Sequence, residues 1–372
     1  MAEADAPAEE GGPEARAAEA DRFPCPRCGA GLRYDPAAKG LRCPFCGEIH
    51  SIEAGGPALE KDLAEALAGA RRSHEEAGAA APAVRKVRCE SCAAEVLVPA
   101  TEKAGRCAYC GSSRVLEEER DPGRILPDSI VPFAVDRPQA EDLFRRWVRS
   151  LWFRPNALKS RTAIGEMRGV LLPYWTFDAR AKSRWTAMAG YHYYVTVGSG
   201  KNQHTEQRTR WEPAAGRRSD FYDDLLVLAS RGLEQALVEK IEPFSLDDLV
   251  PFKPDYLAGW AAEAYAVDVA EAWKIGSARI LESQEERCGG DVPGDTCRDL
   301  DVRTDLSEQR YRHTLLPVWV AAYQFRGKTF RFLVNGQTGE VQGHAPISWA
   351  KIALLVLGVA AAVGVIVLIA GG

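Results

Sequence analysis

Long apolar stretches are almost absent from the first part of this chain of 372 residues. Residues 1–21 hold no large apolar side chain beyond Met1, so nothing there can drive a core. We expect a disordered acidic tail. The same stretch lacks the basic and apolar regions of a secretory signal peptide, which predicts a body that stays in the cytoplasm.

An excess of positive charge is also missing. The formal net charge is -5, and the first twenty residues alone contribute that much, with six acidic side chains against Arg16. The rest of the chain is therefore formally neutral. This balance argues against a polybasic nucleic-acid binder, because such proteins need a surplus of Lys and Arg to neutralise phosphates.

Catalytic motifs are lacking as well. The six histidines are scattered, and Gly198-Ser199-Gly200-Lys201 fails as a phosphate-binding loop, since Val195 and Asn202 replace the required glycine and hydroxyl residue. Asp223 and Asp224 look like solvated residues before a helix. We predict no enzyme, no cofactor-binding residue and no small-molecule substrate, and leave open an unrecognised activity within 117–346.

Cysteine, by contrast, is concentrated in a pattern. Eight of the ten cysteines form four Cys-x-x-Cys pairs, and fourteen residues separate the pairs within each of two units. Two such knuckles close a tetrahedral four-thiolate site in a segment too small to fold alone. We predict two structural zinc ions in two zinc ribbons, with these ligands: Cys25, Cys28, Cys43 and Cys46; Cys89, Cys92, Cys107 and Cys110.

The remaining cysteines and the ribbon charges add two expectations. Cys288 and Cys297 find no further Cys or His pair to complete a metal site, so we expect free thiols. Each ribbon has a formal charge of +3, which four thiolates and one Zn²⁺ reduce to +1. So small a surplus favours protein docking over phosphate binding.

The organisation predicted from these patterns is an α+β multidomain protein. All nine Trp lie between 147 and 349, which places the main core there. The predicted units are a disordered tail 1–21, zinc ribbon 22–52, Ala-rich helical linker 53–86, zinc ribbon 87–116, aromatic-rich α+β domain 117–346 and transmembrane tail 347–372.

Within 117–346, periodicity predicts several elements. They are a helix over Ala140–Leu151, a strand pair over 170–197, helices over Leu225–Ile241 and Tyr256–Ile280, and three strands over Leu315–Val341. A faint repeat links 130–133 and 171–175 to 249–252 and 315–319. Both an internal duplication of two helix-plus-sheet halves and a chance recurrence stay open.

The C-terminus holds the one long apolar run. Ile352–Ala370 is nineteen residues without a charge, and at 1.5 Å per residue it spans roughly 28 Å, close to the thickness of a bilayer core. We predict one transmembrane helix that contacts the lipid bilayer. Lys351 precedes the run and no charge follows it, which predicts a single-pass protein of the cytoplasmic membrane with its N-terminal body inside.

Several blocks together resemble a known group. The ribbon Phe23–Gly29, the blocks Leu171–Phe177 and Arg210–Pro213, and Val334–Glu340 before an apolar helix are similar to uncharacterised bacterial zinc-ribbon membrane proteins. Their ribbon resembles that of transcription factor IIB, and they are often labelled primosomal protein N′ (replication factor Y), a superfamily II helicase. The chain lacks the ATP-binding loop and acidic box of a helicase.

The resemblance implies partners of the band-7 (SPFH) or phage-shock type in a membrane-stress system. Our leading hypothesis is a non-enzymatic, tail-anchored adaptor that binds protein partners at the cytoplasmic face of the membrane. The alternative is a nucleic-acid-associated replication or repair factor, as the helicase label implies. The near-neutral body favours the adaptor.

Overall fold

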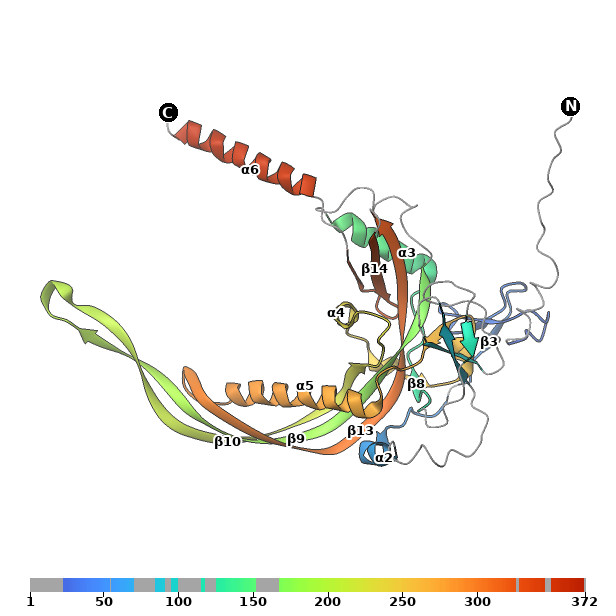
Figure 1. Ribbon diagram of the computed structural model, residues 1–372, viewed down its shortest axis with the longest axis horizontal. Coiled ribbons are helices and arrows are strands. Elements are labelled where there is room, and N and C mark those ends of the chain that lie inside the picture. The colour runs from blue at the N-terminus through green and yellow to red at the C-terminus, as the bar shows by residue number, and fades with distance from the viewer. Residues whose placement is uncertain are drawn as a thin grey trace.

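The computed structural model describes residues 23–53, 55–69, 84–90, 95–99, 115–117, 125–151, 167–325, 328–344 and 349–370 (Figure 1). The protein is α+β, as predicted, and a 12-stranded mixed sheet organises it. A separate 3-stranded antiparallel sheet, in the order β1-β2-β3, belongs to the first ribbon. Its strands are β1 Arg33–Asp35, β2 Gly40–Arg42 and β3 Ile49–Ser51.

The large sheet combines short strands with three very long ones. Its members are β4 Lys61–Asp62, β5 Val84–Cys89, β6 Glu95–Pro99, β7 Val115–Glu117, β8 Ser129–Ile130, β9 Arg168–Val197, β10 His204–Leu228, β11 Val250–Pro251, β12 Ala261–Glu263, β13 Thr296–Phe325, β14 Lys328–Asn335 and β15 Val341–Gly343. The helices are α2 Leu63–Gly69, α3 Arg137–Ser150, α4 Gln235–Val238, α5 Val269–Gly290 and α6 Trp349–Ala370.

Three long strands form a curved arm that leaves the body (Figure 1). β9 and β13 have 30 residues each and pair antiparallel from Arg168 opposite Val320 to Gly190 opposite Thr296. β10 pairs along the other edge of β9. Beyond Gly190 the β9–β10 hairpin continues as a two-stranded tip.

The inner face of the arm is covered by α5. Residues 179, 181, 183, 185, 187 and 189 of β9 are buried, whereas the residues between them are exposed or half-buried, so one face of the strand packs and the other meets solvent. Several of these residues are alanines, which let the helix approach closely. Ser183 donates to Gln284 of α5 at 2.7 Å within this contact.

The two halves of the core make equivalent hydrogen bonds. The indole of Trp175 donates to the carbonyl of Val267 at 2.9 Å, and the indole of Trp319 donates to that of Val135 at 3.0 Å. Each tryptophan therefore binds the segment that precedes the helix of the other half. Leu172 of β9 lies directly opposite Leu316 of β13, close to both tryptophans in sequence.

The same reciprocity appears in the strands and caps. β8 pairs parallel with β13, and β12 pairs parallel with β9. Asp136 caps α3 by accepting from the N–H of Gln139, and Asp268 caps α5 by accepting from that of Glu271. These contacts favour the duplication over chance, and they match β8 with β12 rather than with β11, the strand at the repeat proposed for 249–252.

The structure changes two of the predicted elements and confirms two others. The helix predicted over Ala140–Leu151 is present as α3, which begins three residues earlier at Arg137, and three strands cover the region Leu315–Val341 as expected. The strand pair over 170–197 is wrong, because this segment is the single strand β9 and its hairpin partner is β10. The helix over Leu225–Ile241 is also wrong: Leu225–Leu228 pairs with Tyr174–Phe177, and only the four-residue α4 follows.

The helix predicted over Tyr256–Ile280 is correct only in its later part. The segment first forms β12, and α5 then begins after Asp268 and extends to Gly290. A short apolar run has the same composition in a buried strand and in a buried helix, so its pairing partner decides the outcome. That partner lies far away in sequence in both cases.

The tail anchor predicted over Ile352–Ala370 is corrected. In the part of the chain that the structure describes, no helix is long and apolar enough to cross a membrane. This finding contradicts the transmembrane helix in the predicted fold class and the predicted single-pass cytoplasmic-membrane localisation.

We expect Trp175→Phe and Trp319→Phe to destabilise the protein by a similar amount, about 1–3 kcal/mol each. Each change leaves a carbonyl without its indole donor, the buried carbonyl of Val267 or the partly buried carbonyl of Val135. Urea unfolding of the purified variants measures the difference. Tyr194→Phe, at a side chain that is 69% exposed, is the control and should change the unfolding free energy by less than about 0.5 kcal/mol. Two tryptophan variants as stable as this control would contradict the role of the paired bonds.

Candidate metal centre

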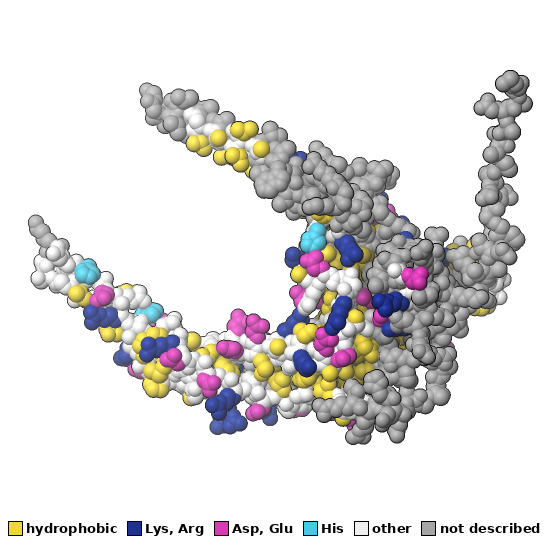
Figure 2. Space-filling view, in the orientation of Figure 1, with side chains coloured by type: hydrophobic (Ala, Val, Ile, Leu, Met, Phe, Trp, Pro, Cys, Tyr) yellow, Lys and Arg dark blue, Asp and Glu magenta, His cyan; other side chains and the backbone are white. Residues whose placement is uncertain are grey.

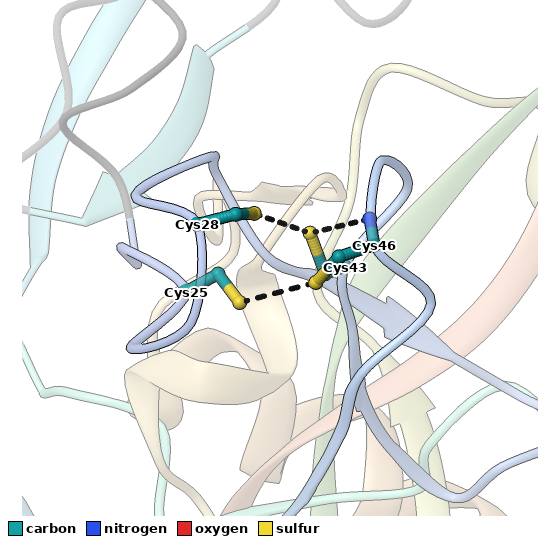
Figure 3. Close-up of side chains that lie close together, drawn as sticks. All are labelled: Cys25, Cys28, Cys43 and Cys46. Carbon is teal, nitrogen blue, oxygen red and sulfur yellow. Dashed lines mark hydrogen bonds between the residues drawn. The ribbon is translucent and has the colours of Figure 1, made fainter.

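Four of the predicted zinc ligands meet at one point. Figure 3 shows Cys25, Cys28, Cys43 and Cys46 with their sulfur atoms directed toward a common centre. The Sγ atoms of Cys25 and Cys46 are 3.6 Å apart, those of Cys28 and Cys43 are 3.5 Å apart, and all four lie within 4.8 Å of one another. A tetrahedral zinc with bonds of about 2.3 Å requires sulfur separations near 3.8 Å, so the cluster fits this metal.

Two similar turns of the backbone produce this geometry. Gly29 and Gly47 follow the second cysteine of each pair with φ of 76° and 75°, a region that glycine enters without a steric penalty. Each donates its N–H to the carbonyl of the first cysteine, at 2.8 Å to Cys25 and 3.0 Å to Cys43.

Local hydrogen bonds favour a thiolate at Cys43, and two ion pairs neutralise part of the positive charge of the ribbon. The backbone N–H of Cys46 donates to the sulfur of Cys43 at 3.5 Å, and this bond lowers the pKa of Cys43 to about 6. Arg27 pairs with Glu48 at 3.0 Å, and Arg42 pairs with Asp35. Both acidic residues of the ribbon thus neutralise a basic neighbour, which weakens its attraction for phosphate.

The ribbon is joined to the main core. The N–H of Tyr34 donates to the carbonyl of Ala258 at 2.9 Å, and the indole of Trp260 donates to the carbonyl of Tyr34 at 3.1 Å. Cys25 and Cys43 are 2% and 1% exposed and belong to the core cluster around Phe133 and Leu257. A metal held there would fix β1 and β2 against the body.

The other predicted cysteine positions have different outcomes. Cys92, Cys107 and Cys110 of the second ribbon lie outside the described residues, as does the side chain of Cys89, so the second zinc site stays a prediction. Cys288 is buried and Cys297 is exposed, and both are free thiols as expected.

A cluster that the sequence did not reveal lies at the root of the arm. Glu60, Asp178 and Asp224 bring one carboxylate oxygen each to within 4.8 Å of one another. Arg312 lies among them, with its Nη2 atom 2.5 Å from Asp224 and 3.7 Å from Glu60. Its guanidinium supplies a positive charge beside two of the three carboxylates.

Asp224, which the sequence predicts to be a solvated residue before a helix, instead lies half-buried in a bulge of β10. A bulge in β10 gives Asp224 a φ of 52° and directs its backbone N–H to Asp178 at 2.8 Å. Asp178 is 3% exposed, and burial followed by the nearby Glu60 raises its pKa to about 6. The three acidic residues of this cluster are far apart in the sequence, so no local sequence motif predicts it.

Comparisons with known proteins add one relative. The chain is 28% identical over 341 residues to the uncharacterized protein YdjG of Bacillus subtilis (strain 168), covering 91% of this chain and 94% of the relative. No family model matches the chain. No solved structure matches it either.

Replacing Cys43 with Ser should lower the zinc content by one ion per chain, because a four-thiolate site loses its closure when one ligand is removed. Elemental analysis of the purified protein measures this loss. The variant should also expose Trp260, seen as a red shift of tryptophan fluorescence, since the ribbon that holds Tyr34 over it loosens. Cys288→Ser is the control and should keep the wild-type zinc content, and an unchanged zinc content in Cys43→Ser would rule out this site.

The buried Asp178 predicts a defined pH dependence. Its pKa of about 6 in the folded protein lies above the ordinary aspartate value of 3.8, so the folded state binds the proton more tightly and its stability falls as the pH rises from about 4 to about 6. Asp178→Asn keeps an acceptor for the N–H of Asp224 and removes the titration. We expect the variant to gain stability relative to the wild type across this window, by at most about 3 kcal/mol, in urea unfolding at several pH values. A difference that is constant with pH would contradict the assignment.

Proposed function

We propose that the protein is a non-enzymatic zinc-ribbon adaptor that uses its long arm to bind protein partners. The observation that carries this proposal is the arm itself, a curved sheet of three strands that extends well beyond the core (Figure 1). One face of this arm packs against α5 and the other face is exposed, so the arm offers a long open surface to a partner.

The tip of the arm supports this function. Within the described residues, β10 pairs only with β9, and the part of β9 beyond Gly190 pairs only with β10. Tyr193 and Tyr194 in this tip are 45% and 69% exposed. Exposed tyrosines and open strand edges are features that protein partners use.

The first ribbon supports a structural role for its metal. Four thiolates close the coordination sphere, and such sites stabilise a fold rather than activate a substrate. Its contacts through Tyr34 and Trp260 join it to the core, which suits a scaffold that keeps the arm in a fixed position. The resemblance to bacterial zinc-ribbon proteins implies band-7 or phage-shock type partners, and we carry this over as part of the proposal.

A shortened arm tests the proposal. Tyr191 and Arg210 lie directly opposite one another, so residues 192–209 can be replaced by an Asn-Gly turn that closes the hairpin. We expect proteins that co-purify with the wild-type chain from cell extracts to fall at least about tenfold on the shortened chain, in quantitative mass spectrometry. Zinc content and unfolding midpoint should stay at wild-type values, because the removed tip lies beyond α5 and the core.

The outcomes separate the adaptor from its rivals. An unchanged set of co-purified proteins on the shortened arm would overturn the arm as the binding element. Duplex DNA binding by the wild type that persists at about 0.15 M salt would favour the replication or repair factor. ATP hydrolysis that disappears in Lys201→Ala would show an enzyme and overturn the non-enzymatic part of the proposal.

A further inference from the structure

Three arginines lie side by side across the arm and form what we term the arginine row, namely Arg184, Arg217 and Arg303. Arg217 of β10 is directly opposite Arg184 of β9, and Arg184 is directly opposite Arg303 of β13. Residues directly opposite share a face of the sheet, and α5 packs against the other face, where Trp185 is buried. The row therefore lies on the outer face of the arm, where Figure 2 shows Lys and Arg side chains projecting from its lower side.

The row carries an energetic cost that the fold does not require. Like charges directly opposite on adjacent strands destabilise a sheet, since their Cβ atoms are about 5 Å apart. Arg184 and Arg303 are 72% and 86% exposed, and their acidic neighbours Asp305 and Asp301 lie at 3.7 and 3.5 Å. Such long, exposed ion pairs compensate little of the repulsion. A costly arrangement on an open surface indicates a bound anion rather than a packing role.

We propose that the arginine row docks an acidic segment of a protein partner. This inference rests on the proposed adaptor function and adds a second binding surface, which lies on the arm outside the tip at residues 192–209. Neighbouring strands are about 4.8 Å apart, so the row is about 10 Å long, which corresponds to about three residues of an extended peptide. Each guanidinium presents a planar fork of N–H donors that binds a carboxylate through two parallel hydrogen bonds.

The surroundings of the row match a protein better than a nucleic acid. Asp301 and Asp305 flank Arg303 two residues away on the same face of β13, so the positive charge is confined to a short row, which suits a short acidic segment better than a continuous phosphate backbone. Phe221 lies four residues from Arg217 on the same face and is 48% exposed, with Arg180 stacked over its ring at 5.2 Å. Arginine beside exposed aromatic side chains is the composition of protein interfaces.

A peptide-binding measurement tests the row. The probe is a short fluorescein-labelled peptide of alternating Glu and Ser, and its matched partner has Gln in place of Glu. The row variant of the full chain carries Arg184→Gln, Arg217→Gln and Arg303→Gln. The control variant carries Arg146→Gln, Arg149→Gln and Lys240→Gln, which removes the same charge from exposed positions away from the arm.

We expect fluorescence anisotropy at about 0.15 M salt to show that the Glu peptide binds the wild type and the control variant, while the row variant binds it at least about tenfold more weakly. The Gln peptide should not bind. The unfolding midpoint of the row variant should be equal to or above that of the wild type, because three repelling charges are gone. This result excludes misfolding as the cause of lost binding.

Three results would overturn the proposal. They are absence of Glu-peptide binding by the wild type, equal binding by the row variant, and duplex DNA that binds the wild type more tightly than the Glu peptide and is lost in the row variant. The last assigns the row to nucleic acid. The row lies outside residues 192–209, so the two experiments test different surfaces. If the shortened arm loses its partners while the row variant still binds the Glu peptide, the row is rejected and the adaptor function is kept.

Discussion

The antiparallel pairing of β9 with β13 is the interaction on which the rest of the structure depends. Each strand has 30 residues, and Leu172 of β9 lies directly opposite Leu316 of β13. At one end, the paired strands receive β8 and β12 in equivalent positions, and the indoles of Trp175 and Trp319 reach across to the opposite half. At the other end, the same two strands continue as the arm, so core and arm share one continuous backbone ladder.

The metal centre depends on this core as much as on its own ligands. A ribbon of three short strands has too little apolar surface to be stable alone, and zinc binding supplies the missing free energy. Here the ribbon also buries Leu32, Tyr34 and Leu41 in the core cluster that contains Leu257. Metal and core therefore stabilise each other, and loss of zinc should increase the exposure of Trp260 to solvent.

Like charges meet in two places, and the two environments resolve the repulsion differently. At the root of the arm, Glu60, Asp178 and Asp224 are drawn around Arg312, and burial raises the pKa of Asp178 so that a proton can neutralise it. On the outer face, the arginine row stays charged in water, where screening keeps the cost small. The first arrangement fixes β4 and the bulge of β10 to the sheet, and the second leaves donors open to a partner.

The sequence by itself determined the α+β class, the four-cysteine cluster of the first ribbon and the helix over most of Ala140–Leu151, because spacing and periodicity are local signals. Only the tertiary structure decided that Leu225–Leu228 is a strand, since its partner Tyr174–Phe177 lies about fifty residues away. It also assembled the Asp178 cluster and the arginine row, whose members come from three different strands or segments. The apolar run at 352–370 shows the limit of local reading: composition alone predicted a membrane span, and no helix in the described part of the chain qualifies. Properties that depend on which strands become neighbours cannot be found in any single stretch of sequence, because strand pairing joins residues without a fixed separation along the chain.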